Sequence, residues 1–182
     1  MKTTSRGTMG AWLLGVLLAL AASAEAGPTD TPLPTFSDGK AAVAVYTAFG
    51  VIKHSNLETD FMCTNTGTAA VDIGLEVFDE TGALRNSVHA GSGAVLNVGV
   101  GETKTIGTGA TAVLHEDVVI STLGPGGNGT NSLSNGSARV VATAKSVTCT
   151  AMLADKLHAI ADPAISSVPP PPFTNLPLTP VP

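Results

Sequence analysis

The sequence predicts an all-β protein, folded as one sandwich of seven to eight mostly antiparallel strands. Apolar and polar residues alternate with a period of two in short runs, and Gly, Asn and Asp separate these runs. This pattern is typical of antiparallel strands with one buried face. Only 13% of the residues are charged, about half the usual share. Ala, Val, Gly and Thr are abundant, which favours closely packed sheets over helices with charged faces.

The clearest alternation lies at residues 70–79. The turn residues 80–82 follow, where Gly82 is free to adopt a positive φ, and 83–89 are expected to return as the hairpin partner. The branched apolar side chains of the first strand fall on one face, and they are Val71, Ile73, Leu75 and Val77.

Further strands are predicted from similar runs along the chain. Residues 94–100 repeat the alternation before a turn at 101–103. The remaining strand candidates are 41–53, 58–65, 112–122 and 138–153. Because a slip of one residue exchanges the two faces of a strand, periodicity leaves the strand order open.

The N-terminus has the features of an export signal. Two basic residues precede an apolar run at 12–22, and small residues follow at the spacing that a signal peptidase reads. Cleavage is expected before Glu25 or between Ala26 and Gly27, and the second site is preferred because Gly27 then opens a loop-like mature N-terminus. An uncleaved membrane anchor is the alternative, but the run is shorter than a spanning helix requires.

The sequence predicts that the chain divides into four segments. Residues 1–26 form the signal peptide, 27–40 an N-terminal extended segment, 41–162 the β-sandwich domain, and 163–182 a Pro-rich disordered tail. Removal of the signal leaves about 155 residues, enough for one domain with a substantial core. A Gly, Asn and Ser stretch at 124–136 is expected to be a mobile loop.

Two cysteines lie within predicted strands of this exported chain. Cys63 and Cys149 both fall on apolar faces, and an even cysteine count in an exported protein favours a disulfide. We therefore predict a Cys63–Cys149 bridge, which would stabilise the fold by about 4–5 kcal/mol in the chain-entropy model. Free buried thiols and a redox-active pair remain as alternatives.

Several segments resemble bacterial immunoglobulin-like and adhesion-type β-sandwich modules. The likeness rests on the two cysteines, on Asn65-Thr66-Gly67, on the alternation at 71–77 and on the turn at 79–82. It covers residues 41–155 and implies a single immunoglobulin-like β-sandwich. The chain departs from antibody domains because its single Trp, Trp12, lies in the signal and leaves no core Trp. Residues 61–65 and 136–153 also resemble exported bacterial proteins of uncharacterised role.

The sequence offers no catalytic, metal or cofactor motif, so we expect a non-enzymatic protein without a cofactor. The densest polar cluster is residues 115–117, which fits a cation site or general base and equally a solvated turn. No Gly-x-Ser-x-Gly elbow or calcium loop occurs. The histidines are scattered singly, at His54, His89, His115 and His158.

Charge and aromatic content limit the possible partners. The formal net charge is −5 and no basic stripe occurs, so nucleic acid is a poor partner. Phe78 falls on the polar face of its strand, where it would either contact a partner or be covered by a neighbouring loop. Asn128 and Asn135 lie in N-glycosylation sequons, and whether they are modified depends on the host.

These observations predict a function class rather than an activity. We expect a structural or interaction module in the cell envelope or extracellular space, with an unknown protein or glycan partner. The alternative is a ligand- or glycan-binding module that uses end loops such as 124–136. The oligomeric state and the final location, whether periplasmic, cell-surface or secreted, stay open, and no membrane span is expected after signal cleavage.

Overall fold

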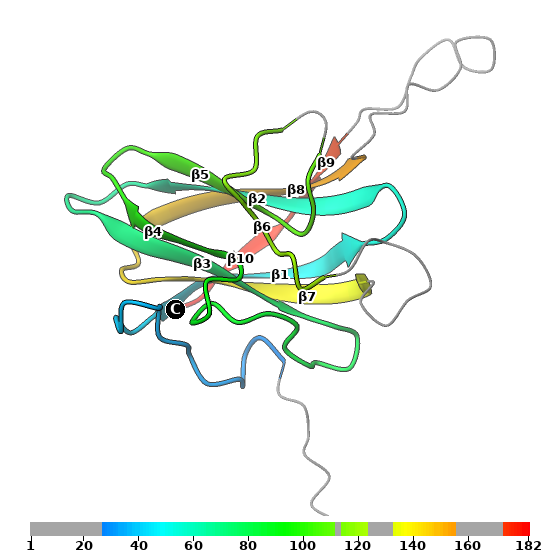
Figure 1. Cartoon of the computed structure of the whole chain (residues 1–182), viewed down its shortest axis with the longest axis horizontal. Helices are drawn as coiled ribbons and strands as arrows, with labels where there is room; N and C mark the ends of the chain where they lie inside the picture. The colour runs from blue at the N-terminus through cyan, green and yellow to red at the C-terminus, as the bar shows by residue number, and fades with distance from the viewer. Residues whose placement is uncertain (1–26, 112–113, 124–132, 156–172) are drawn as a thin grey trace, which may run out of the picture.

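The computed structural model describes residues 27–111, 114–123, 133–155 and 173–182, which form two β-sheets packed face to face (Figure 1). The five-stranded sheets have the orders β10-β1-β7-β3-β4 and β6-β5-β2-β8-β9. The strands are β1 (Val43–Lys53), β2 (Leu57–Asn65), β3 (Val71–Phe78), β4 (Ala94–Val98), β5 (Thr103–Gly107), β6 (Val118–Val119), β7 (Leu133–Ala142), β8 (Val147–Asp155), β9 (Phe173–Leu176) and β10 (Leu178–Pro180).

The predicted all-β class is confirmed. Ten strands lie in the described part of the chain, against the seven to eight predicted, and no helix occurs there. All strand pairs are antiparallel except β5 with β6. The predicted signal peptide at 1–26 lies outside the described residues.

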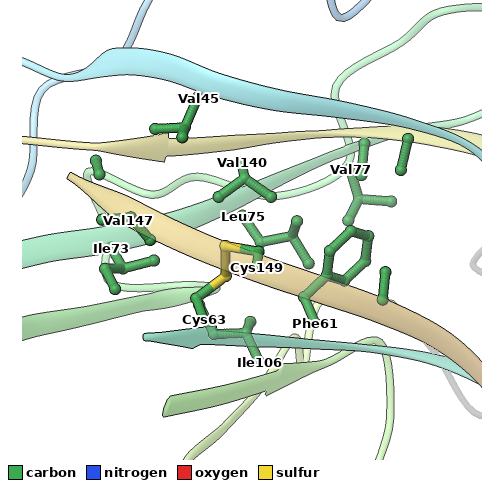
Figure 2. Close-up of a cluster of buried hydrophobic side chains, with 14 of the residues drawn as sticks. Val45, Phe61, Cys63, Ile73, Leu75, Val77, Ile106, Val140, Val147 and Cys149 are labelled. Carbon is green, nitrogen blue, oxygen red and sulfur yellow. A yellow bond between two sulfur atoms is a disulfide. The ribbon is translucent and has the colours of Figure 1, made fainter. Parts of the chain in front are cut away.

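The main core lies between the two sheets (Figure 2). The alternation predicted at residues 70–79 is confirmed, because the four branched side chains of β3 are at most 5% exposed and point into this core. The opposite face of β3 is buried as well, since all eight residues of the strand are buried. Burying both faces of a central strand requires a cover on the outer side of the first sheet.

The N-terminal segment helps to form that cover. Residues 27–40 do not extend freely from the domain: Phe36 is fully buried and packs with Ala42, Val88 and Val141 in a second, smaller cluster. Phe78 is also fully buried. The expectation that a neighbouring segment covers Phe78 is therefore confirmed, and the alternative that Phe78 lies on a partner surface is wrong.

The predicted hairpin partner at 83–89 is not a strand. Leu84 makes one isolated bridge to Phe78, and the buried side chain of Asn86 takes the place of further strand pairing. Its amide donates to the carbonyl of Leu75 at 2.7 Å, and its Oδ1 accepts from the N–H of Val77 at 2.8 Å. A side-chain amide can satisfy backbone groups in this way without a regular ladder.

Three other boundaries differ from the prediction. β5 begins at Thr103, the last residue of the predicted turn at 101–103, and covers residues for which no strand was predicted. Its one large buried apolar residue, Ile106, gives little period-two signal. The run at 138–153 divides into β7 and β8. Among the described residues 114–122 of the predicted strand at 112–122, only the two-residue β6 is a strand. The predicted loop at 124–136 ends earlier, because β7 begins at Leu133; residues 124–132 lie outside the described part.

The C-terminal tail differs most from the prediction. We expected 163–182 to be a disordered Pro-rich tail, but residues 173–180 supply β9 and β10. β9 pairs with β8 at the edge of one sheet and β10 pairs with β1 at the edge of the other (Figure 1). Prolines are tolerated at edge positions whose nitrogen faces away from the ladder, which explains how this segment joins the sheets. Residues 163–172 are outside the described ranges.

Candidate functional site

The predicted disulfide between Cys63 and Cys149 is confirmed, and the alternative of free thiols is wrong. The two cysteines face each other in register on β2 and β8, with their Cα atoms 4.1 Å apart. Figure 2 shows the bridge among Ile73, Leu75 and Ile106. The cysteines are only 1% and 9% exposed, so an attacking thiolate would have little access. Because the bridge lies in the core, we interpret its role as structural.

The bridge also differs from that of antibody domains. It joins neighbouring strands of one sheet, whereas the antibody disulfide crosses between the two sheets. For the predicted cleavage site, Ala26 lies outside the described residues, and Gly27 opens a turn by accepting bonds from Asp30 and Thr31.

The histidines and the 115–117 cluster form no catalytic set in the described part of the chain. His54 contacts Ser55 and His89 contacts Thr35, each at an exposed position. His158 lies outside the described residues. Within the described ranges, no group of three or more His, Cys, Asp or Glu side chains is arranged to hold a metal ion.

The acidic members of that cluster have local partners. Asp117 pairs with Lys104 and accepts the N–H of Thr105, and these contacts lower the pKa of the Asp117 carboxyl against the opposing effect of burial. Glu116 accepts bonds from the N–H and hydroxyl of Thr111. These interactions support the interpretation of 115–117 as a turn.

The structure reveals a buried carboxylate that the sequence did not predict. Asp60 lies on the outer face of the second sheet, is fully buried, and neither carboxylate oxygen has a hydrogen-bond partner. Burial raises the pKa of Asp60 to about 7, with a further contribution from the nearby carboxylates of Glu116 and Glu58. Asp60 can therefore exchange a proton near neutral pH.

Two glycines make room for this acidic cluster. Gly107 lies opposite Asp60 on β5, and a Cβ added there would lie 2.5 Å from both Asp60 Oδ1 and the carbonyl oxygen of Gly109. Similarly, a Cβ on Gly109 would overlap the carboxylate of Glu58. The 108–111 segment is fixed over the sheet by Thr108, which exchanges bonds with the backbone of Thr59. Gly107 and Gly109 were a possible sequence signal for this close approach.

Arg139 anchors the N-terminal segment on the first sheet. Its side chain is 3% exposed and makes an ion pair with Glu76, with a shortest N–O distance of 2.6 Å. The guanidinium also donates to the carbonyls of Pro28, Thr31 and Pro32. With the two bonds to Glu76, all five N–H donors are used. Burial raises the pKa of the Glu76 carboxyl, and the ion pair opposes that rise.

A cavity of about 390 Å³ adjoins this anchor. It lies between the N-terminal segment and β1, and its lining includes Leu33, Ala44, Thr47, Arg139 and Val181. Arg139 is the only cation in this lining, and its donors are already used. The cavity therefore has no available charged donor with which to recognise an anionic ligand.

The C-terminal strap, which we define as residues 173–182, closes one side of the sandwich. Its two strands finish both sheets, and Val181 N–H donates to the carbonyl of Val45 at 2.9 Å. Leu176 and Leu178 pack against the main core. A pocket of about 300 Å³ that opens to the surface lies beside the strap and is lined by Tyr46, Cys149, Thr150, Ala151, Asn175, Leu176 and Leu178.

No helix in the described ranges is long and apolar enough to cross a membrane. Comparisons of the chain with protein-family models, with curated proteins and with solved structures find no match. The geometry of the strap, the Asp60 cluster and the disulfide is therefore the basis for a functional assignment.

Proposed function

We propose that this protein is an exported, non-enzymatic interaction module of the cell envelope or extracellular space. The observation that supports this proposal most directly is the C-terminal strap. One short segment completes the edges of two sheets, and an edge that accepts a strand from its own chain has the hydrogen-bonding geometry to accept a strand from another. A protein that binds others through sheet edges needs no catalytic residues.

The disulfide is compatible with the proposed location. A buried bridge between strands β2 and β8 is stable in an oxidising compartment, whereas cytoplasmic thiols are kept reduced. We further propose an immunoglobulin-like or adhesion-type module, supported by the two layers of antiparallel strands. The position of the bridge within one sheet is a departure from the antibody pattern.

The role is tested by site-specific photo-crosslinking in the native host. A photoreactive residue replaces Thr179, which is exposed on β10, and the matched control carries it at Thr148, which is exposed on β8. We expect discrete adducts at Thr179 that unlabelled protein outcompetes, and no such adducts at Thr148. Equal labelling at both positions, or robust hydrolase activity of the purified protein in a broad substrate screen, would contradict the proposal.

A further inference from the structure

We propose that the cavity between the N-terminal segment and β1 is a binding site for a small, uncharged and mostly apolar molecule that carries one hydrogen-bonding group such as a hydroxyl. This binding role goes beyond the interaction role of the sheet edges and does not depend on it. The cavity measures about 390 Å³, within the range of about 300–1,000 Å³ that small-molecule sites occupy. It is open to solvent on one side, so a ligand can enter.

A bulge in β1 forms the floor of this cavity. Ala44 and Thr47 both line it, although residues three apart on a regular strand point to opposite faces of the sheet. The ladder with β7 shifts by one residue between Ala44 and Tyr46, and this extra residue returns Thr47 to the face of Ala44. Their partners on β7 are Val141 and Arg139. The bulge therefore brings a small side chain and a hydroxyl together on the outer face of the first sheet.

The walls of the cavity are held in place by bonds within the chain. One wall includes Pro28 and Leu33 of the N-terminal segment, which Arg139 fixes through its bonds to backbone carbonyls. A second wall is Val181, whose N–H donates to the carbonyl of Val45 at 2.9 Å. Figure 1 shows the C-terminus beside the N-terminal segment. Because the site is formed before a ligand arrives, binding costs little ordering entropy.

Thr47 supplies the polar group that would recognise the ligand. The residue is 7% exposed, and its hydroxyl makes no hydrogen bond to the described residues. Since Thr47 lines the cavity, the part of its side chain that stays accessible faces this space. The hydroxyl of Thr31, by contrast, already donates to the carbonyl of Gly27 at 3.0 Å. A ligand with a hydroxyl or carbonyl would satisfy Thr47, whose unpaired burial otherwise costs free energy.

The lining favours an uncharged ligand. Arg139 is the cation among the described lining residues, and its donors all bond to Glu76 or to the N-terminal segment. No carboxylate occurs among those lining residues, so a cationic ligand would find no counter-charge there. A charged group would lose its hydration against Leu33, Ala44 and Val181 without compensation.

The volume sets the size of the ligand. Because a dry cavity of about 150 Å³ holds benzene, a space of about 390 Å³ accommodates about 10 to 15 non-hydrogen atoms. Leu33 is 48% exposed and adds apolar area at the opening. Thymol, an uncharged phenol, is a probe of this size. p-Cymene is the same molecule without the hydroxyl, and cuminate carries a carboxylate in place of the methyl group of p-cymene.

The test is an NMR titration of the full chain with these three probes at neutral pH. Ala44→Leu fills the floor of the cavity, whereas Thr47→Val removes the hydroxyl and keeps the shape of the side chain. The control is Ala70→Leu, which makes the same change as the first variant at an exposed position before β3. A urea midpoint for each variant checks that it is folded.

We expect saturable thymol binding with the largest amide shifts at Ala44 and Thr47. p-Cymene and cuminate should bind at least about fivefold more weakly, because one loses a hydrogen bond and the other desolvates a charge. Thr47→Val should weaken thymol about fivefold and leave p-cymene unchanged. Ala44→Leu should abolish thymol binding, and Ala70→Leu should not change it.

Thymol shifts that do not saturate would overturn the inference. Thymol binding that survives in folded Ala44→Leu, or that is unchanged in folded Thr47→Val, would also overturn it. Cuminate binding as tight as that of thymol would overturn the ligand class. If Ala44→Leu does not fold, the comparison of thymol with p-cymene on Thr47→Val decides alone. None of these outcomes affects the interaction role, which the photo-crosslinking test in the host addresses separately.

Discussion

Replacing Asp60 with Asn should stabilise the fold more at alkaline than at acidic pH. In the native state the Asp60 carboxyl is buried without a hydrogen-bond partner, and its pKa is raised from 3.8 to about 7. The folded state therefore holds a proton that the unfolded state releases at lower pH. The stability associated with this proton is fully present below about pH 4 and is lost as pH rises through about 7.

The size of this effect follows from the two pKa values. A difference of about three units corresponds to about 4 kcal/mol of lost stability at pH 8 and about 2 kcal/mol at pH 5. Asn at position 60 keeps the shape of the side chain but does not ionise. The stability of the Asp60→Asn variant relative to the wild type should therefore increase by about 2–3 kcal/mol between pH 5 and pH 8.

Urea unfolding of both proteins at the two pH values measures this difference. Other titrating groups are common to both proteins and cancel in the comparison. Asp30→Asn is the matched control, because Asp30 is exposed and its substitution removes the same charge. A difference between Asp60→Asn and wild type that does not change with pH would refute the reasoning, as would a larger gain at pH 5.

Three further predictions concern the anchor, the bridge and the glycine contact. Arg139→Lys should lower the free energy of unfolding by about 2–4 kcal/mol, since an ammonium cannot reproduce the five hydrogen bonds of the guanidinium. Residues 27–40 should then become sensitive to limited proteolysis, and continued protection of this segment would contradict the prediction. Replacing both Cys63 and Cys149 with Ala should cost about 4 kcal/mol, because the bridge spans 86 residues, and an unchanged urea midpoint would argue against it. Gly109→Ala should lower the melting temperature by several degrees, because the new methyl displaces a buried carboxylate; Gly27→Ala, where the added carbon meets open space, should not.

The sequence predicted those strands in which apolar and polar side chains alternate with the period of two that a strand imposes. Residues 70–79 showed their buried face directly because branched side chains alternate there without interruption. The cysteine pairing was likewise predictable, since two cysteines allow only one intramolecular connection. β5 was missed because Ile106 alone carries its apolar signal, and the 83–89 segment was misassigned because Asn86 satisfies the backbone through its side chain.

The candidate site depended on contacts between segments distant in sequence. Asp60 has the spacing of a residue on a solvent-facing strand surface, and only the segment carrying Gly107 and Gly109 makes that surface buried. The two strands of the strap were not predicted from the Pro-rich sequence. The effect of a proline on a strand depends on whether its nitrogen faces the ladder or the solvent, and the sequence does not show this. The role of Arg139 likewise depends on distant residues, because its carbonyl partners Pro28, Thr31 and Pro32 lie in the N-terminal segment.

We propose that the chain works outside the cytoplasm as a disulfide-bonded sandwich. An intact-mass spectrum of the protein from its native host, recorded with and without reduction and alkylation, tests this most directly. We predict a chain that begins at Glu25 or Gly27 and is two hydrogens lighter until it is reduced. A mass that retains Met1 to Ala26 and two alkylatable thiols would contradict both the compartment and the covalent framework on which the proposed function depends.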